Sequence, residues 1–171
     1  MGHLHSSSDA LRRRNSESGA AAVEFALVVP ILLVIVFGVI TFGMVFASQL
    51  SMNSAARDAA RAGVVQNLNA AGLTCSQIAA QARAQVDPLG GKSTDVAITV
   101  TGPDGSTACS IAKNTASVTG SGSTAMCTNS SGLTGQLVVK LTYTANSPLN
   151  LIPAASSIPL SAAGSFTCEY S

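Results

Sequence analysis

The sequence predicts an α+β fold, in which a transmembrane helix continues into a long helix that packs on a small antiparallel β-sheet. Three observations lead to this prediction. Residues 25–47 carry no charged side chain, the alanine-rich residues 49–63 follow without a break, and segments with alternating apolar residues come later. A chain of 171 residues has room for one small domain beside such an anchor.

The anchor is the apolar run from Phe25 to Ala47, which contains 23 residues. A helix of that length reaches about 34 Å, enough to cross a hydrocarbon core of about 30 Å. A cleaved secretion signal has a shorter apolar segment, of roughly 7–15 residues, and a small-residue cleavage site after it. Because Ser48–Ser51 fits such a site poorly, we expect a membrane anchor.

Charge indicates the orientation of the anchor. Arg12, Arg13 and Arg14 lie just before the run, so the positive-inside rule places the N-terminus in the cytoplasm and the C-terminus outside. The formal net charge of the chain is only +1, and no other basic cluster is present. This composition gives no reason to expect nucleic acid as a partner.

Four cysteines, Cys75, Cys109, Cys127 and Cys168, all follow the anchor. None forms a C-x-x-C pair, and the only histidines lie near the N-terminus, so the spacing does not indicate zinc. We expect two disulfides on the oxidising side of the membrane. Of the three connectivities we favour Cys109–Cys127, which brackets a Gly/Ser-rich segment, with Cys75–Cys168, which would tie the C-terminal strand to the helical region.

Small residues recur every four positions along the helix that leaves the membrane. They are Gly43, Ala47, Ser51, Ala55, Ala59 and Gly63. Small side chains at this spacing allow close approach of another helix. The series drifts by about 40° at each step and therefore spirals around the helix. Alanine-rich composition alone also produces such a series, and we interpret it as a packing surface.

The outer domain is predicted from periodicity and turn residues. Residues 75–86 have amphipathic helical spacing and end at the Asp87–Gly91 turn. Alternation predicts strands at 95–101 and 137–144, and we expect 107–111 to pair back across the turn at 102–105, with a last strand at 161–170. The Ser/Thr/Gly-rich residues 115–135 are expected to form a long loop tethered by Cys127.

One short segment adds a functional hypothesis. Gly19 and Ala20 are followed by Glu24, with the apolar run directly behind them. This arrangement resembles the processing site of prepilins of the type IV filament family. Together with the Ala55–Ala62 block, AARDAARA, the segment from Ser18 to Gly63 is similar to the TadE-like proteins, pilin-like subunits of the bacterial Tad/Flp system.

The resemblance implies how the chain is divided and processed. Residues 1–19 would be a cytoplasmic leader that prepilin peptidase removes after Gly19, which leaves Ala20 as the new N-terminus. Residues 20–48 would span the membrane, 49–88 would form an extracytoplasmic helical region, and 89–171 a small β-rich domain. Glu24 would then pair with the new α-amine of a neighbouring subunit during assembly.

The resemblance also implies a function and a location. The chain is too long for a major Flp pilin, so we expect a minor pilin or pseudopilin that acts in pilus assembly, secretion and adhesion. Its partners would be prepilin peptidase, other pilins or pseudopilins, the Tad assembly machinery and the membrane. We expect a single-pass protein of the cytoplasmic membrane, with the cell surface or pilus as a further location.

No catalytic constellation stands out in the sequence. The absence of histidine after the leader leaves no Ser-His-Asp or Cys-His arrangement, and the acidic residues of the outer region are scattered. We therefore expect a non-enzyme without a cofactor or metal. Two alternatives stay open: an uncleaved bitopic adhesin or binding module, and an anchored enzyme with an unrecognised site.

Overall fold

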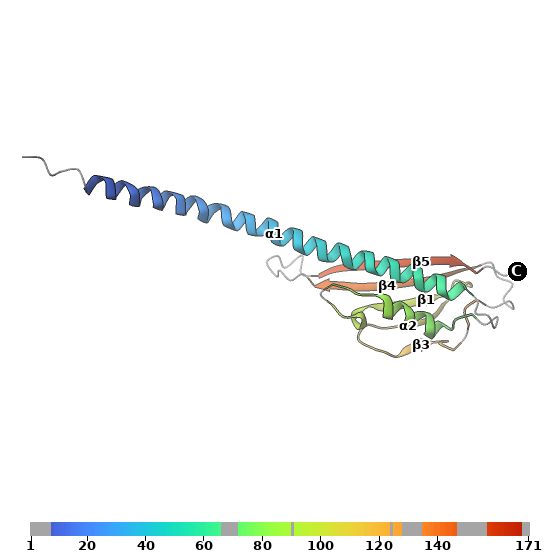
Figure 1. Cartoon of the computed structure of the whole chain (residues 1–171). Helices are drawn as coiled ribbons and strands as arrows, with labels where there is room; N and C mark the ends of the chain where they lie inside the picture. The colour runs from blue at the N-terminus through green and yellow to red at the C-terminus, as the bar shows by residue number, and fades with distance from the viewer. Residues whose placement is uncertain are drawn as a thin grey trace, which may run out of the picture. The chain divides into compact units, whose positions relative to one another are not determined.

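The computed structural model describes residues 8–65, 72–89, 91–123, 125–127, 135–146 and 157–168. Side chains are described from residue 19 onward. The chain forms two compact units, Met1–Thr41 and Phe42–Ser171. The described residues of the first unit, 8–41, are helical, and the second unit holds the β domain (Figure 1).

Helix α1 runs without interruption over Ser8–Val64. This confirms that the apolar run continues into the alanine-rich segment as one helix, as expected for sequences of high helix propensity. In the first unit the apolar side chains of α1 are exposed, among them Phe25, Leu27 and Val34 at 69–71%. Apolar side chains on all sides of a helix are normally covered by lipid or by other helices.

Helix α2 spans Cys75–Gln85, within one residue of the predicted helix. Its N-terminus is fixed by a capping box in which Thr74 and Gln77 bond to each other's backbone N–H groups. The short 3₁₀ helix η1, Ser93–Asp95, follows and leads into the first strand.

Five antiparallel strands form one sheet in the order β3-β2-β1-β4-β5. Their bounds are β1 Ala97–Thr101, β2 Thr107–Ile111, β3 Val118–Gly120, β4 Gln136–Asn146 and β5 Ser157–Thr167. The predicted hairpin is confirmed, because β1 pairs with β2 across a turn at Gly102–Ser106. In this turn the carboxylate of Asp104 accepts hydrogen bonds from the Ser106 hydroxyl and N–H, and these bonds lower the pKa of Asp104.

Alternation places one face of the sheet in the core and the other toward solvent. Along β4 the side chains of Leu137, Val139, Leu141 and Tyr143 are buried, while those of Lys140, Thr142 and Thr144 are exposed. Helices α1 and α2 cover the buried face: α1 contributes a row of small core residues and Met52, and α2 lies over β1 and β2 (Figure 1). The α+β fold is therefore confirmed.

The structure corrects three details of the predicted domain. Two helices, not one, pack on the sheet, because α2 buries Ile78, Ala79 and Ala82. Val118–Gly120 forms strand β3 inside the segment that was expected to be a loop, because it pairs with β2 at the sheet edge. The last strand begins at Ser157 instead of residue 161, since β5 pairs with β4 along its whole length.

Both pairs of cysteines form disulfides, but the expected pairing is wrong. The bonds are Cys75–Cys109 and Cys127–Cys168, in place of Cys109–Cys127 and Cys75–Cys168. The strand order explains the difference. Cys75 opens α2, which lies over β2 and Cys109, whereas the end of β5 lies beyond β4 on the other side of β1. Cys127 follows a bridge between Ala125 and Thr74.

Candidate functional site

The three residues of the predicted processing and docking site lie on one exposed part of α1. Gly19, Ala20 and Glu24 are all helical and exposed, and no atom lies within 4 Å of the position of a Cβ on Gly19. Ala20 and Glu24 are four residues apart, so they share a face of the helix at an axial separation of about 6 Å. The Gly19–Ala20 peptide bond is thus accessible from several sides.

The small residues that recur every four positions are placed differently along the helix. Gly43 is exposed, and no atom lies within 4 Å of the position of its Cβ, while Ala47 is partly buried. Ala55 and Ala59 are buried in the core, and a Cβ on Gly63 would collide with the side chains of Leu137 and Ile78.

Ser51 is the remaining member of the series, and it contacts the rest of the domain through a hydrogen bond. Its hydroxyl accepts from the N–H of Asp87 at 2.9 Å. The close approach that the sequence assigned to another helix is therefore made at Ser51, Ala55, Ala59 and Gly63 by the chain's own β domain and α2. Gly43 is the member of the series that stays open to a partner.

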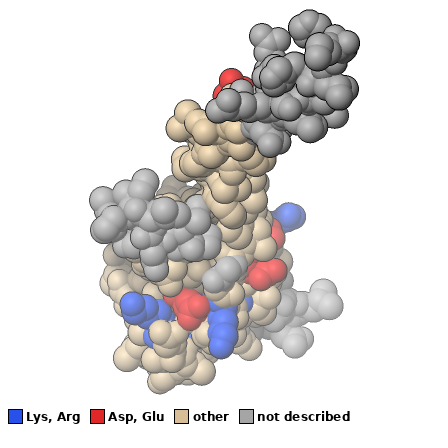
Figure 2. Space-filling model, turned by 90° about the vertical axis from the view of Figure 1, so that its left-hand side faces the viewer, with Lys and Arg blue, Asp and Glu red and all other residues tan. Residues whose placement is uncertain are grey.

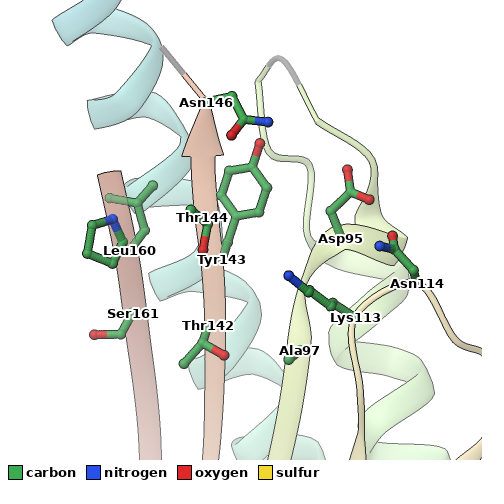
Figure 3. A pocket seen from close by; sticks show the side chains of 11 residues that line it. Asp95, Ala97, Lys113, Asn114, Thr142, Tyr143, Thr144, Asn146, Leu160 and Ser161 are labelled. Atoms are coloured by element: carbon green, nitrogen blue, oxygen red, sulfur yellow. The ribbon is translucent and has the colours of Figure 1, made fainter. Parts of the chain in front are cut away.

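A pocket of about 670 Å³ lies at one end of the sheet. Pairing of β1 with β4 stops at Ala97 and Thr142, so the last residues of β4, Tyr143–Asn146, have β5 on one side and the pocket on the other. Asp95, Lys113 and Asn114 face β4 across this space (Figure 3). The pocket offers a carboxylate, an ammonium group, amides and hydroxyls, which suit a polar ligand.

Sequence reasoning missed this pocket. Its polar side chains come from η1, the segment after β2, and strands β4 and β5, so no local pattern brings them together. In the sequence Asp95 is one of several scattered acidic residues, and Tyr143 is one residue of the predicted strand at 137–144. Among the described residues, no group of three His, Cys, Asp or Glu side chains is placed to hold a metal ion.

Among the described residues, the fold and the helix together define a class of protein: one N-terminal helix that is apolar and long enough to cross a membrane, followed by a disulfide-linked α+β domain. Residues 19–61 match the family model of the TadE-like protein. The match confirms the resemblance over the exposed apolar helix and its continuation, residues 19–61. Comparisons with curated proteins and with solved structures gave no match.

Proposed function

We propose that the chain is a minor pilin or pseudopilin of a Tad/Flp pilus or secretion system, with a structural and not a catalytic role. The observation that supports this proposal most is the placement of Gly19, Ala20 and Glu24 where the exposed apolar part of α1 begins. The family match begins at Gly19 and includes all three residues.

In the proposed mechanism, prepilin peptidase cuts the Gly19–Ala20 bond on the cytoplasmic side. The bond lies within α1, and peptidases need an extended substrate, so the helix must open locally. Glycine favours this opening, because it costs a helix about 1 kcal/mol relative to alanine. Cleavage creates an α-amine on Ala20, and Glu24 of an adjacent subunit supplies the carboxylate that neutralises it in an apolar environment.

The two disulfides support the proposed orientation. Cys75–Cys109 and Cys127–Cys168 both lie after the apolar run, in the second unit, and require an oxidising compartment. The β domain would therefore stand outside the cytoplasmic membrane, while Arg12, Arg13 and Arg14 remain inside. In this position the domain is available to other pilins, to the assembly machinery or, in adhesion, to an external surface.

The first experiment is intact mass and N-terminal sequencing of the protein from membranes of its native host. A chain that starts at Ala20 would support the pilin proposal. A chain that starts at residue 1 or 2 would contradict it and favour the uncleaved binding module, for which the polar pocket beside Tyr143 is the candidate site. A start near Ser48 would indicate an ordinary secretion signal.

The cleavage site itself is tested by Gly19→Leu, with Gly19→Ala as the matched control. Leucine places a branched side chain directly at the scissile bond, and we expect accumulation of the unprocessed chain. Alanine keeps the residue small, and we expect processing to continue. The measurement is the mass of the chain extracted from membranes, which distinguishes the processed from the unprocessed form. Normal processing of Gly19→Leu would refute the assigned site.

The docking role is tested by Glu24→Ala, with Glu24→Asp as the control that keeps the charge. We expect Glu24→Ala to insert into the membrane at the wild-type level but to reduce the number of pili or the secreted product severalfold. Glu24→Asp should retain part of the function, since a carboxylate is still present. Wild-type piliation of cells that carry Glu24→Ala would exclude the pairing with Ala20.

A further inference from the structure

The direction of the backbone groups along β4 follows from a contact of its neighbour β5. In an antiparallel sheet each residue directs its N–H and C=O to one side, and successive residues alternate between the two sides. The carbonyl of Ser161 accepts a hydrogen bond from the side chain of Gln49 at 2.7 Å, and β5 is the last strand of the sheet, so this carbonyl points away from β4. Ser161 pairs with Thr142, and both residues of such a pair point away from each other. The N–H and C=O of Thr142 are therefore directed toward β1.

The other side of the sheet gives the same assignment. The carbonyl of Ser110 accepts from the hydroxyl of Thr119 on β3 at 3.3 Å, so Ser110 points to β3 and the next residue, Ile111, points to β1. Ile111 pairs with Ile98, which points back to β2, and its neighbour Ala97 therefore points to β4. Ala97 thus makes the last hydrogen bonds of the ladder between β1 and β4.

Beyond this ladder, backbone groups of β4 face the pocket. Thr144 and Asn146 alternate in step with Thr142, so their N–H and C=O groups also point away from β5. Strand β1 begins at Ala97, and within the described residues no strand continues the ladder past Thr142. Thr144 and Asn146 are exposed and line the pocket (Figure 3). Backbone groups placed in this way are the part of a sheet to which an added strand binds.

The opposite wall of the pocket is held at a fixed position. Arg83 of α2 donates to the carbonyls of Val96 and Ala112 at 2.9 and 3.3 Å. The N–H of Asn114 donates to the carbonyl of Thr94 at 2.6 Å. These bonds join the residues before β1 to the turn after β2. Such a wall needs little rearrangement to accept a ligand, which lowers the entropic cost of binding.

A positive charge lies at the closed end of the gap, beside the start of β1. The register that pairs Ile111 with Ile98, continued by two residues, places Lys113 next to Val96. Lys113 is exposed and lines the pocket, and Figure 3 shows its side chain pointing toward β4. Figure 2 shows basic and acidic side chains next to each other on one face of the β domain, so single charges at defined places would select a partner there. The ammonium group of Lys113 suits a carboxylate.

We propose that the pocket binds the C-terminal residues of a partner protein as a short added strand, antiparallel to β4, with the α-carboxylate at Lys113. A strand in this direction pairs with Thr144 and Asn146, runs toward Ala97 and must end before it. The reverse direction would place an α-ammonium group beside Lys113. A peptide of about four residues fills the gap as far as Asn146. The proposal concerns the β domain alone and holds whether or not the leader is removed.

The experiment uses the full-length protein, immobilised in detergent, and a library of random tetrapeptides that end in a free carboxyl group. Retained peptides are measured by mass spectrometry. We expect at least about tenfold more retention than for the same library with C-terminal amides, which lack the charge that pairs with Lys113. Lys113→Gln should remove this difference, while Lys140→Gln, which changes an exposed lysine of β4 outside the pocket, should keep it. Retention of the acids no better than that of the amides, or an unchanged preference in Lys113→Gln, would overturn the proposal.

Binding as a strand is tested with the peptide that is retained best. N-methylation of its penultimate residue removes the N–H opposite Thr144, and we expect the affinity to fall at least about fivefold. N-methylation of the preceding residue, whose N–H points away from β4, is the matched control and should change the affinity less than about twofold. Fluorescence anisotropy of the labelled peptides gives both values. Equal effects of the two methyl groups would show that the peptide does not pair with β4 and would contradict the proposal.

Discussion

Tyr143 occupies an unusual position for a residue with a polar tip. Its side chain is 6% exposed, and its hydroxyl group lies against Gly91, where a Cβ would collide with it. Burial raises the pKa of the Tyr143 hydroxyl above its ordinary value of 10.0, and the negative charge of Asp95 adds to the effect. The neutral form of Tyr143 is therefore favoured in the folded state.

A pH dependence of stability follows at the residue scale. Because the pKa of Tyr143 is higher in the folded than in the unfolded chain, stability is fully present below about pH 10 and is lost as the pH rises through the folded value. We expect the free energy of unfolding of the full chain in detergent to fall above pH 10. The measurement is denaturant unfolding between pH 8 and 11.

The matched control is Tyr143→Phe, which keeps the ring and removes the titrating group. This variant should lose most of the alkaline decrease that Tyr143 causes. An identical pH profile for both proteins would show that other groups are responsible. The pKa of Asp104, which is lowered by its bonds to Ser106, acts only at the acid end of the range and does not affect this comparison.

At the scale of elements, α1 and β5 approach each other closely because both carry small residues. A Cβ on Gly164 would collide with the backbone of Ala56 and Arg57. Backbone atoms of a helix cannot move aside as a flexible side chain can. The contact therefore depends on glycine at this position and fixes how the helix lies on the sheet.

Gly164→Ala is expected to destabilise the full chain by about 1–3 kcal/mol, the usual cost of overpacking a tight contact. Ser165→Thr also adds one methyl group, but on the exposed face of the same strand, and it should change stability by no more than about 0.5 kcal/mol. Thermal unfolding of both variants in detergent gives the comparison. Equal stability of Gly164→Ala and the wild type would mean that α1 packs elsewhere.

Helices and strands long enough to show a repeating pattern of apolar residues were predictable from the sequence, and the short strand β3 was not. Strand β4 was found because Leu137, Val139, Leu141 and Tyr143 alternate without interruption, and α2 because its buried residues recur at helical spacing. Strand β3 has only three residues, two of them exposed, so no alternation marks it. It forms because β2 offers a free edge for pairing.

At the scale of the whole molecule, the disulfide pairing is directly testable. Cleavage after the basic residues at 61, 83, 92, 113 and 140 places each cysteine in a separate tryptic peptide. Under non-reducing conditions we expect residues 62–83 to be linked to 93–113, and residues 114–140 to 141–171. A peptide 93–113 linked to 114–140 would contradict the structure and restore the pairing expected from the sequence.

The sequence by itself determined the long apolar helix, the α+β class and the family resemblance. Each of these rests on local information: an uninterrupted apolar run, alternation within single strands, and the spacing of Gly19 and Glu24. Hydrophobic periodicity acts over one element, so it can be read from neighbouring residues. Formation of both disulfides was also predictable, because all four cysteines follow the anchor.

Only the tertiary structure decided what depends on residues far apart in the chain. The order β3-β2-β1-β4-β5 brings Cys75 to Cys109, and because β1 begins only at Ala97, the pocket beside Tyr143 stays open. The small residues of α1 looked alike in sequence, yet most of them serve the chain's own sheet. Strand order and the faces that helices cover are set by packing of the whole domain, which no local pattern encodes.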